Sequence, residues 1–101
     1  MSAGTPFPPG RRFRRSPQVA LRPEPFGALA YHFGTRRLSF LKTPMLVATV
    51  EALEDSVDVH AALDRARVPA GQRAAYLAAL TELAGAGTIE PVPTGPDGVA
   101  A

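Results

Sequence analysis

The chain has 101 residues, including 11 prolines and no cysteine, and its formal net charge is +2. The lack of cysteine excludes disulfides, thiolate nucleophiles, iron–sulfur clusters and cysteine-ligated zinc within this chain. No apolar run approaches the ~20 residues of a membrane-spanning helix, and the first residues lack the apolar segment of a secretion signal. We therefore expect a soluble, cytoplasmic protein without a membrane partner.

Charge is distributed unevenly along the chain. Residues 1–42 hold eight positive side chains and one negative, whereas residues 43–101 hold three positive and eight negative. A basic half attracts anionic partners such as nucleic acid, anionic lipid or an acidic polypeptide. Attraction between the two halves within the fold is the alternative explanation.

Proline and glycine concentrate at both ends of the chain. Residues 1–16 have no sustained apolar period and carry four arginines between positions 11 and 15, which predicts a disordered basic N-terminal tail. Residues 92–101 predict a disordered C-terminal tail. A single domain of residues 17–91 remains, and a domain of this size has little stability to spare.

Three segments with a period of two follow the first tail. Apolar and polar residues alternate over 18–22, bulky and small residues alternate over 28–33, and the alternation resumes over 37–41. Proline and glycine over 23–27, and a short turn at 34–36, separate these segments. The pattern predicts a three-stranded antiparallel meander.

The period changes to that of helices at Thr43. Thr43 is a suitable N-cap and Pro44 suits the first helical position, which predicts a helix to about Asp55. Asp58 is a suitable cap for a second helix. A third helix follows the break at residues 68–71 and stops at a pair of glycines.

Three strands followed by three helices predict an α+β fold in which the helices pack on one face of the sheet. The last two helices, joined by a short turn and followed by an extended piece at residues 88–90, give a winged-helix-like outline. This outline makes a small winged-helix DNA-binding regulator the alternative function.

The third helix argues against DNA binding. It presents mostly alanine, with Gln72 and Arg73 near its start, whereas affinity for DNA comes mainly from several Lys or Arg contacts to phosphate. Nucleic acid is therefore not the expected partner. A steep salt dependence of binding to duplex DNA would identify the regulator.

No group of residues suited to catalysis is visible in the sequence. The two histidines, His32 and His60, have neither a nucleophile nor a second metal ligand beside them, and the carboxylates are spread along the predicted helices. Catalysis and metal binding need a constellation of such side chains. We therefore expect no enzymatic activity, no metal and no cofactor for this chain.

The predicted third strand, residues 37–41, has an open edge. An edge strand exposes unpaired N–H and C=O groups to which a peptide can add a strand. Arg36, Arg37 and Lys42 flank this strand and suit an acidic peptide, and the alanines of the third helix leave room for a groove. Protection of the edge by these charges is the alternative.

Two strings of residues in this part of the chain are long and unusual, Arg-Pro-Glu-Pro-Phe-Gly at 22–27 and Tyr-His-Phe-Gly-Thr-Arg-Arg-Leu-Ser-Phe-Leu at 31–41. The segment that contains them resembles the peptide-chaperone family of mycofactocin biosynthesis. That family belongs to the wider RiPP recognition elements, which bind ribosomally made, later modified peptides and are similar to the pyrroloquinoline quinone peptide chaperone.

The resemblance implies a non-catalytic protein that binds the leader of a ribosomally made precursor peptide and delivers it to a radical S-adenosylmethionine maturase. In the wider family the leader lies as an extra strand between the third strand and the third helix. Carried over to this chain, that position implies Arg37, Leu38, Ser39, Phe40, Leu41, Arg73, Leu77 and Leu80 as peptide-binding residues, and the flanking Arg36 is the ninth candidate because of its charge. The helix leucines are equally candidates for the core.

Overall fold

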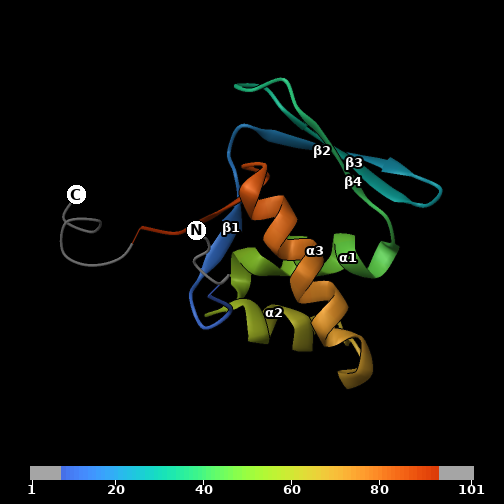
Figure 1. Ribbon diagram of the computed structural model, residues 1–101, viewed down its shortest axis with the longest axis vertical. Coiled ribbons are helices and arrows are strands. Elements are labelled where there is room, and N and C mark those ends of the chain that lie inside the picture. Colours follow the sequence, from blue (N-terminus) through green and yellow to red (C-terminus); the bar gives the residue numbers. More distant parts are fainter. Residues whose placement is uncertain (1–7, 94–101) are drawn as a thin grey trace.

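The computed structural model describes residues 8–93 (Figure 1). The expected α+β architecture, with a three-stranded antiparallel sheet and three helices, is confirmed. In chain order the elements are β1 (Phe13–Arg15), β2 (Val19–Glu24), β3 (Gly27–His32), β4 (Leu38–Leu41), α1 (Pro44–Ala52), α2 (Val59–Arg65), α3 (Arg73–Gly85) and β5 (Ile89–Pro91). Short 3-10 turns, Leu53–Asp55 and Ala70–Gln72, follow α1 and precede α3.

The sheet has the order β2-β3-β4, as the alternating segments predict. Strand β2 runs further than expected, because Pro23 and Glu24 pair with Ala28 and Gly27 rather than ending the strand. Gly27 starts β3 where the chain after β4 passes very close. A Cβ at this position would collide with the carbonyl oxygen of Leu41, which explains why glycine stands there.

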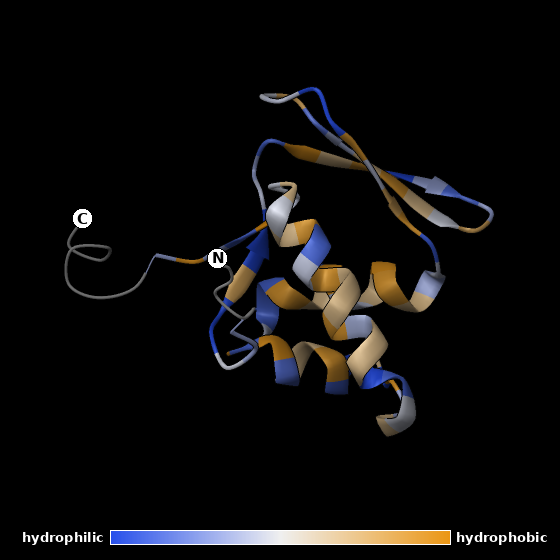
Figure 2. Ribbon diagram, in the orientation of Figure 1, coloured by the Kyte–Doolittle hydropathy of each residue, from blue (hydrophilic) through white to orange (hydrophobic). Residues whose placement is uncertain are grey.

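The two faces of the sheet differ in side-chain size. Ala28 and Ala30 are buried on the face that meets α1, together with Leu41 of β4. The small side chains of these alanines allow the helix to lie close to the strand. Because side chains alternate between the two faces of a strand, the bulkier Leu29 and Tyr31 lie on the opposite face. Figure 1 shows the sheet above the helices, and Figure 2 shows apolar residues along both α1 and the strands.

Both predicted N-caps are confirmed. The Thr43 hydroxyl oxygen accepts a hydrogen bond from the Leu46 amide at 3.0 Å, and the Asp58 carboxylate accepts one from the Ala61 amide at 2.8 Å. Each bond satisfies a donor that the first turn of a helix leaves free. The two helices that start at these caps contribute Val50, Val59 and Leu63 to the fully buried core, and Leu53 of the following 3-10 turn and Leu80 of α3 join them.

The N-terminal segment differs from the expected tail. Residues 13–15 form β1, which pairs antiparallel with β5, and the Phe13 side chain is only 3% exposed. The Arg14 guanidinium donates to the Glu90 carboxylate at 2.8 Å, and the Val92 amide donates to the Arg12 carbonyl oxygen at 3.0 Å. The structure therefore contradicts a disordered tail and a domain boundary here. Residues 1–7 and 94–101 of the expected tails lie outside the described residues.

Candidate functional site

The hydrogen bonds of the central strand β3 determine which amides point to the open edges of the sheet. The His32 amide donates to the Arg37 carbonyl oxygen at 2.9 Å, on the β4 side. Hydrogen-bonded and non-hydrogen-bonded residue pairs alternate along two antiparallel strands. With the observed register, the amide of Ser39 therefore points towards β3, and the amides of Leu38 and Phe40 point to the open edge.

The opposite edge, on β2, offers fewer donors. The Phe33 amide donates to the Gln18 carbonyl oxygen at 2.8 Å. By the same alternation, the backbone nitrogens of Val19, Leu21 and position 23 point to the open edge of β2. The Val19 amide is already bonded to the Ser16 carbonyl oxygen at 3.0 Å. Position 23 is proline, which has no N–H. Strand β4 is therefore the edge better suited to accept another strand.

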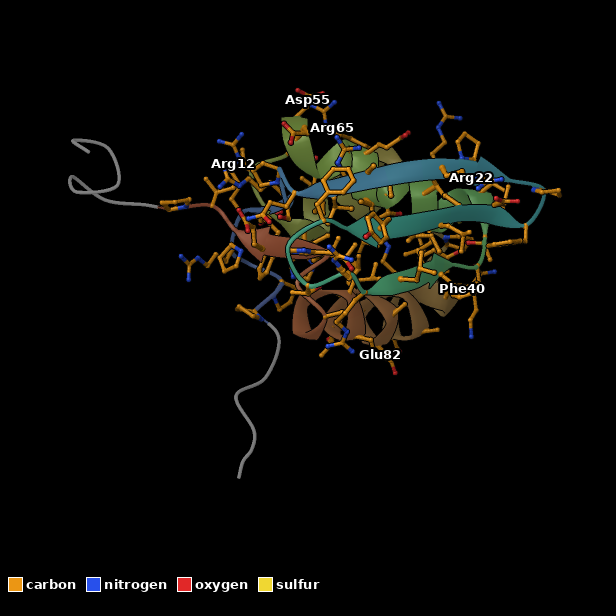
Figure 3. All side chains as sticks on the ribbon, turned by 90° about the horizontal axis from the view of Figure 1, so that it is seen from above. Arg12, Arg22, Phe40, Asp55, Arg65 and Glu82 are labelled. Carbon is orange, nitrogen blue, oxygen red and sulfur yellow. The ribbon has the colours of Figure 1, made fainter. Side chains whose placement is uncertain are left out.

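A groove of about 620 Å³ lies between β4 and α3. Its strand side is formed by Arg37, Leu38, Ser39 and Phe40. Its helix side includes Ala75, Tyr76, Ala79 and Glu82. Figure 3 shows Phe40 on β4 and Glu82 on the neighbouring α3. The two alanines, one helical turn apart, have small side chains that leave space on the helix side of the groove. The groove therefore has room for the side chains of an extended peptide.

Two side-chain hydrogen bonds connect β4 and the residues after it to the helical part of the fold. The Ser39 hydroxyl oxygen accepts from the Thr88 hydroxyl at 3.2 Å. The hydroxyls of Thr43 and Tyr76 are 2.8 Å apart and join the start of α1 to α3. These two bonds fix the position of β4 and the start of α1 relative to α3 and to Thr88, which follows α3, and so hold the two sides of the groove in place.

Four of the nine residues predicted for the site line the groove, and the four are consecutive: Arg37, Leu38, Ser39 and Phe40. Arg36 lies in the turn just before β4, where its amide donates to the His32 carbonyl oxygen at 2.7 Å. Leu41 and Leu80 have no exposed surface and belong to the core. Leu77 is half-buried and packs against the same core.

Arg73 has a structural role at the turn between α2 and α3. Its guanidinium donates to the Asp64 carboxylate at 2.7 Å and to the Val68 carbonyl oxygen at 3.0 Å. The structure therefore does not bring Arg73 to the groove. The leucines and this arginine occupy helix faces that meet the rest of the protein, whereas the groove lies along the alanine face of α3.

Two residues of α3 that the sequence did not point to, Tyr76 and Glu82, complete the groove, and Lys42, expected beside the strand, lines it just after β4. Leu46 and Leu83 are nearly buried and form its apolar floor. The sequence feature that indicates the helix side of the groove is the pair of alanines four residues apart, Ala75 and Ala79, because this spacing places both on one face of α3.

The charges at the groove are free to meet a ligand. Within residues 8–93 the ion pairs join Arg14 to Glu90, Arg22 to Glu24 and Arg73 to Asp64. None of them uses Arg37 or Lys42, which are both exposed at the groove. These two cations favour carboxylates on a bound peptide.

The described residues contain no group of three histidine or acidic side chains placed to hold a metal ion. The imidazole ring of His32 stabilises the turn before β4. Its Nδ1 accepts hydrogen bonds from the amides of Gly34 and Thr35, both at 3.1 Å. Of the helices between residues 8 and 93, none has the length and hydropathy needed to cross a membrane.

Sequence comparison relates most of the chain to known proteins. Residues 12–90 match the model of the peptide chaperone MftB family. Proteins named peptide chaperone MftB from Mycobacterium ulcerans and Mycobacterium tuberculosis are 52% and 51% identical over 85 residues, which are 84% of this chain and 78% of each relative. One from Mycolicibacterium smegmatis is 49% identical over 92 residues, 91% of this chain and 88% of the relative.

No solved structure matches the chain significantly. The family match spans β1 to β5 and includes both sides of the groove, so it covers the candidate site as well as the core. The chain belongs to the peptide chaperone MftB family.

Proposed function

We propose that the protein binds the leader of a ribosomally made precursor peptide in the β4–α3 groove and presents it to a radical S-adenosylmethionine maturase in mycofactocin biosynthesis. Membership of a family of peptide chaperones supports a peptide as the ligand. The observation that carries the binding mode is the pair of outward amides, those of Leu38 and Phe40, beside the groove.

Strand addition accounts for both parts of this surface. The leader lies alongside β4 and exchanges main-chain hydrogen bonds with Leu38 and Phe40, which supplies affinity with little dependence on sequence. Alternate leader side chains then enter the groove, over Leu46 and Leu83 and against the small residues of α3. Apolar leader residues at every second position gain most from this floor.

In this proposal the protein has no catalytic role. It holds the leader in an extended conformation, and the part of the precursor that is modified remains free for the maturase. The iron–sulfur and S-adenosylmethionine chemistry belongs to the maturase.

The charge of the groove predicts how fast an acidic leader binds. Reversing both cations, Arg37→Glu with Lys42→Glu, is expected to slow association with a leader peptide about tenfold at low salt, because like charges then repel during the encounter. The difference shrinks as salt screens the charges. Stopped-flow fluorescence with a labelled leader peptide measures these rates.

A matched control for either single reversal, Arg37→Glu or Lys42→Glu, is Arg65→Glu on α2, which makes the same charge change on the far side of the molecule from Phe40 and Glu82 (Figure 3). It is expected to change the rate less than either groove variant does. A scrambled peptide of the same composition, and so of the same charge, is expected to bind more weakly than the leader. Equal binding of both peptides would contradict the proposed function, and an unchanged rate at low salt would contradict the electrostatic role.

A further inference from the structure

The face of the sheet turned away from the helices is apolar. Leu29 and Tyr31 lie on it, because they alternate with buried alanines along β3. Their partners on β4, Phe40 and Leu38, share this face and are 56% and 57% exposed. Figure 3 looks onto this surface. Exposed apolar side chains grouped in this way mark an interaction surface more often than isolated ones do.

Aromatic rings extend the face at both ends of the sheet. Phe26, in the turn between β2 and β3, stacks on Phe40 with ring centroids 5.9 Å apart. Phe33, which is 58% exposed, meets Tyr31 edge to face with centroids 5.4 Å apart. The rings therefore form two pairs, and the cross-strand pairs Leu29–Phe40 and Tyr31–Leu38 connect the two along the sheet.

The border of this face is basic. Arg22 of β2 pairs across the sheet with Leu29 and therefore lies on the same face, where its side chain is 79% exposed. Arg36 and Arg37 stand in the turn before β4, and Lys42 follows that strand. Glu24 is the one carboxylate between residues 18 and 43, and it is paired with Arg22.

We propose that this outer face, defined by Leu29, Tyr31, Leu38 and Phe40 with Phe26 and Phe33, is the surface that docks the maturase. The inference rests on the proposed function and adds the location of the second partner. The docking surface expected on the maturase is an apolar patch bordered by carboxylates. A leader strand occupies the edge of the sheet and the groove beside it, which Leu38 and Phe40 line, so the β3 part of the face, with Leu29 and Tyr31, remains free when the leader is bound.

Charge and geometry favour this occupant over two others. A second copy of the chain, facing the first across a two-fold axis, would bring one basic border against another. An anionic membrane would suit the charge, but side chains that insert into a bilayer must project, and these rings lie on one another along the sheet. A flat protein surface suits such rings better.

The test replaces the two residues of this face that lie on β3, away from the groove, in the variant Leu29→Thr with Tyr31→Thr. Threonine retains the β-branched preference for a strand. The variant is expected to bind the purified maturase at least about tenfold more weakly, because apolar and aromatic anchors carry most interface energy. Its affinity for the leader peptide is expected to stay within about twofold of the parent, because the β4 edge and the groove are unchanged.

Val57→Thr is the matched control, because Val57 is 79% exposed but lies between the first 3-10 turn and α2 rather than on the sheet. It is expected to leave both affinities unchanged. A second variant, Arg22→Glu, leaves the apolar residues in place and is expected to weaken maturase binding most at low salt.

The outcomes separate the inference from the proposed function. If the double variant and Arg22→Glu bind the maturase as tightly as the parent while the leader still binds, the outer face is not the docking surface and the proposed function stands. If the parent does not bind the leader, the proposed function fails. Loss of self-association, or of binding to phosphatidylserine vesicles, in the double variant with unchanged maturase affinity would assign the face to a second copy or to a membrane, and either would overturn the inference.

Discussion

Phe40→Pro is expected to bind the leader peptide at least about tenfold more weakly than Phe40→Ala. Both substitutions remove the exposed ring and its stacking on Phe26. Only proline also removes the outward amide, which leaves a leader carbonyl without its donor at a cost of about 1–3 kcal/mol. Edge strands tolerate proline where the missing N–H points away from the sheet, so the fold should persist. Fluorescence titration measures the affinity, and circular dichroism checks the fold.

Ser39→Pro is the complementary variant. The register directs its amide towards Ala30 of β3, so proline there removes a bond inside the sheet. This variant is expected to lower the melting temperature of the protein, whereas Phe40→Pro acts mainly on binding. Leader affinity of Phe40→Pro equal to that of Phe40→Ala would show that no strand is added at β4.

Phe13→Ala is expected to lower the free energy of unfolding by about 3–5 kcal/mol, the range for a buried phenylalanine. Phe13 is 3% exposed on the three-residue strand β1 and contributes to the hydrophobic core. For a domain of this size, such a loss of stability lowers the melting temperature by more than about 10 °C, since each kcal/mol corresponds to about 4–8 °C. Urea denaturation followed by circular dichroism measures the change.

Phe33→Ala is the control, because it makes the same substitution at a side chain that is 58% exposed. It is expected to cost less than about 1 kcal/mol, the scale of one edge-to-face aromatic contact. Deleting residues 1–15 removes β1 and should destabilise the protein as much as Phe13→Ala does. If both changes cost no more than Phe33→Ala, β1 would be dispensable, as expected for a tail.

The parts of the fold that sequence alone predicts are those with local causes. The alternation over residues 28–33 marks a strand whatever it packs against, and Thr43 and Asp58 bond to amides three residues away. Strand β1 has no such signal. Its three residues include two arginines, and its pairing with β5 joins segments more than 70 residues apart.

The groove, too, is predictable only where its residues have a local sequence signal. The open edge of β4 follows from the predicted meander, and Arg37 to Phe40 line the groove beside it. On α3 the resemblance implied Leu77 and Leu80, with the core as the alternative, and burial in the core is what large apolar side chains gain most from. A groove needs small side chains, and Ala75 therefore lines it instead.

Amide hydrogen exchange of the free and leader-bound protein tests strand addition most directly. The outward amides of Leu38 and Phe40 should exchange at least about tenfold more slowly when the leader is bound, because each then donates to the added strand. The outward amide of Leu21, on the opposite edge, should be unaffected. Protection of Leu21 without protection of Leu38 and Phe40, or no added protection at either edge, would contradict the account.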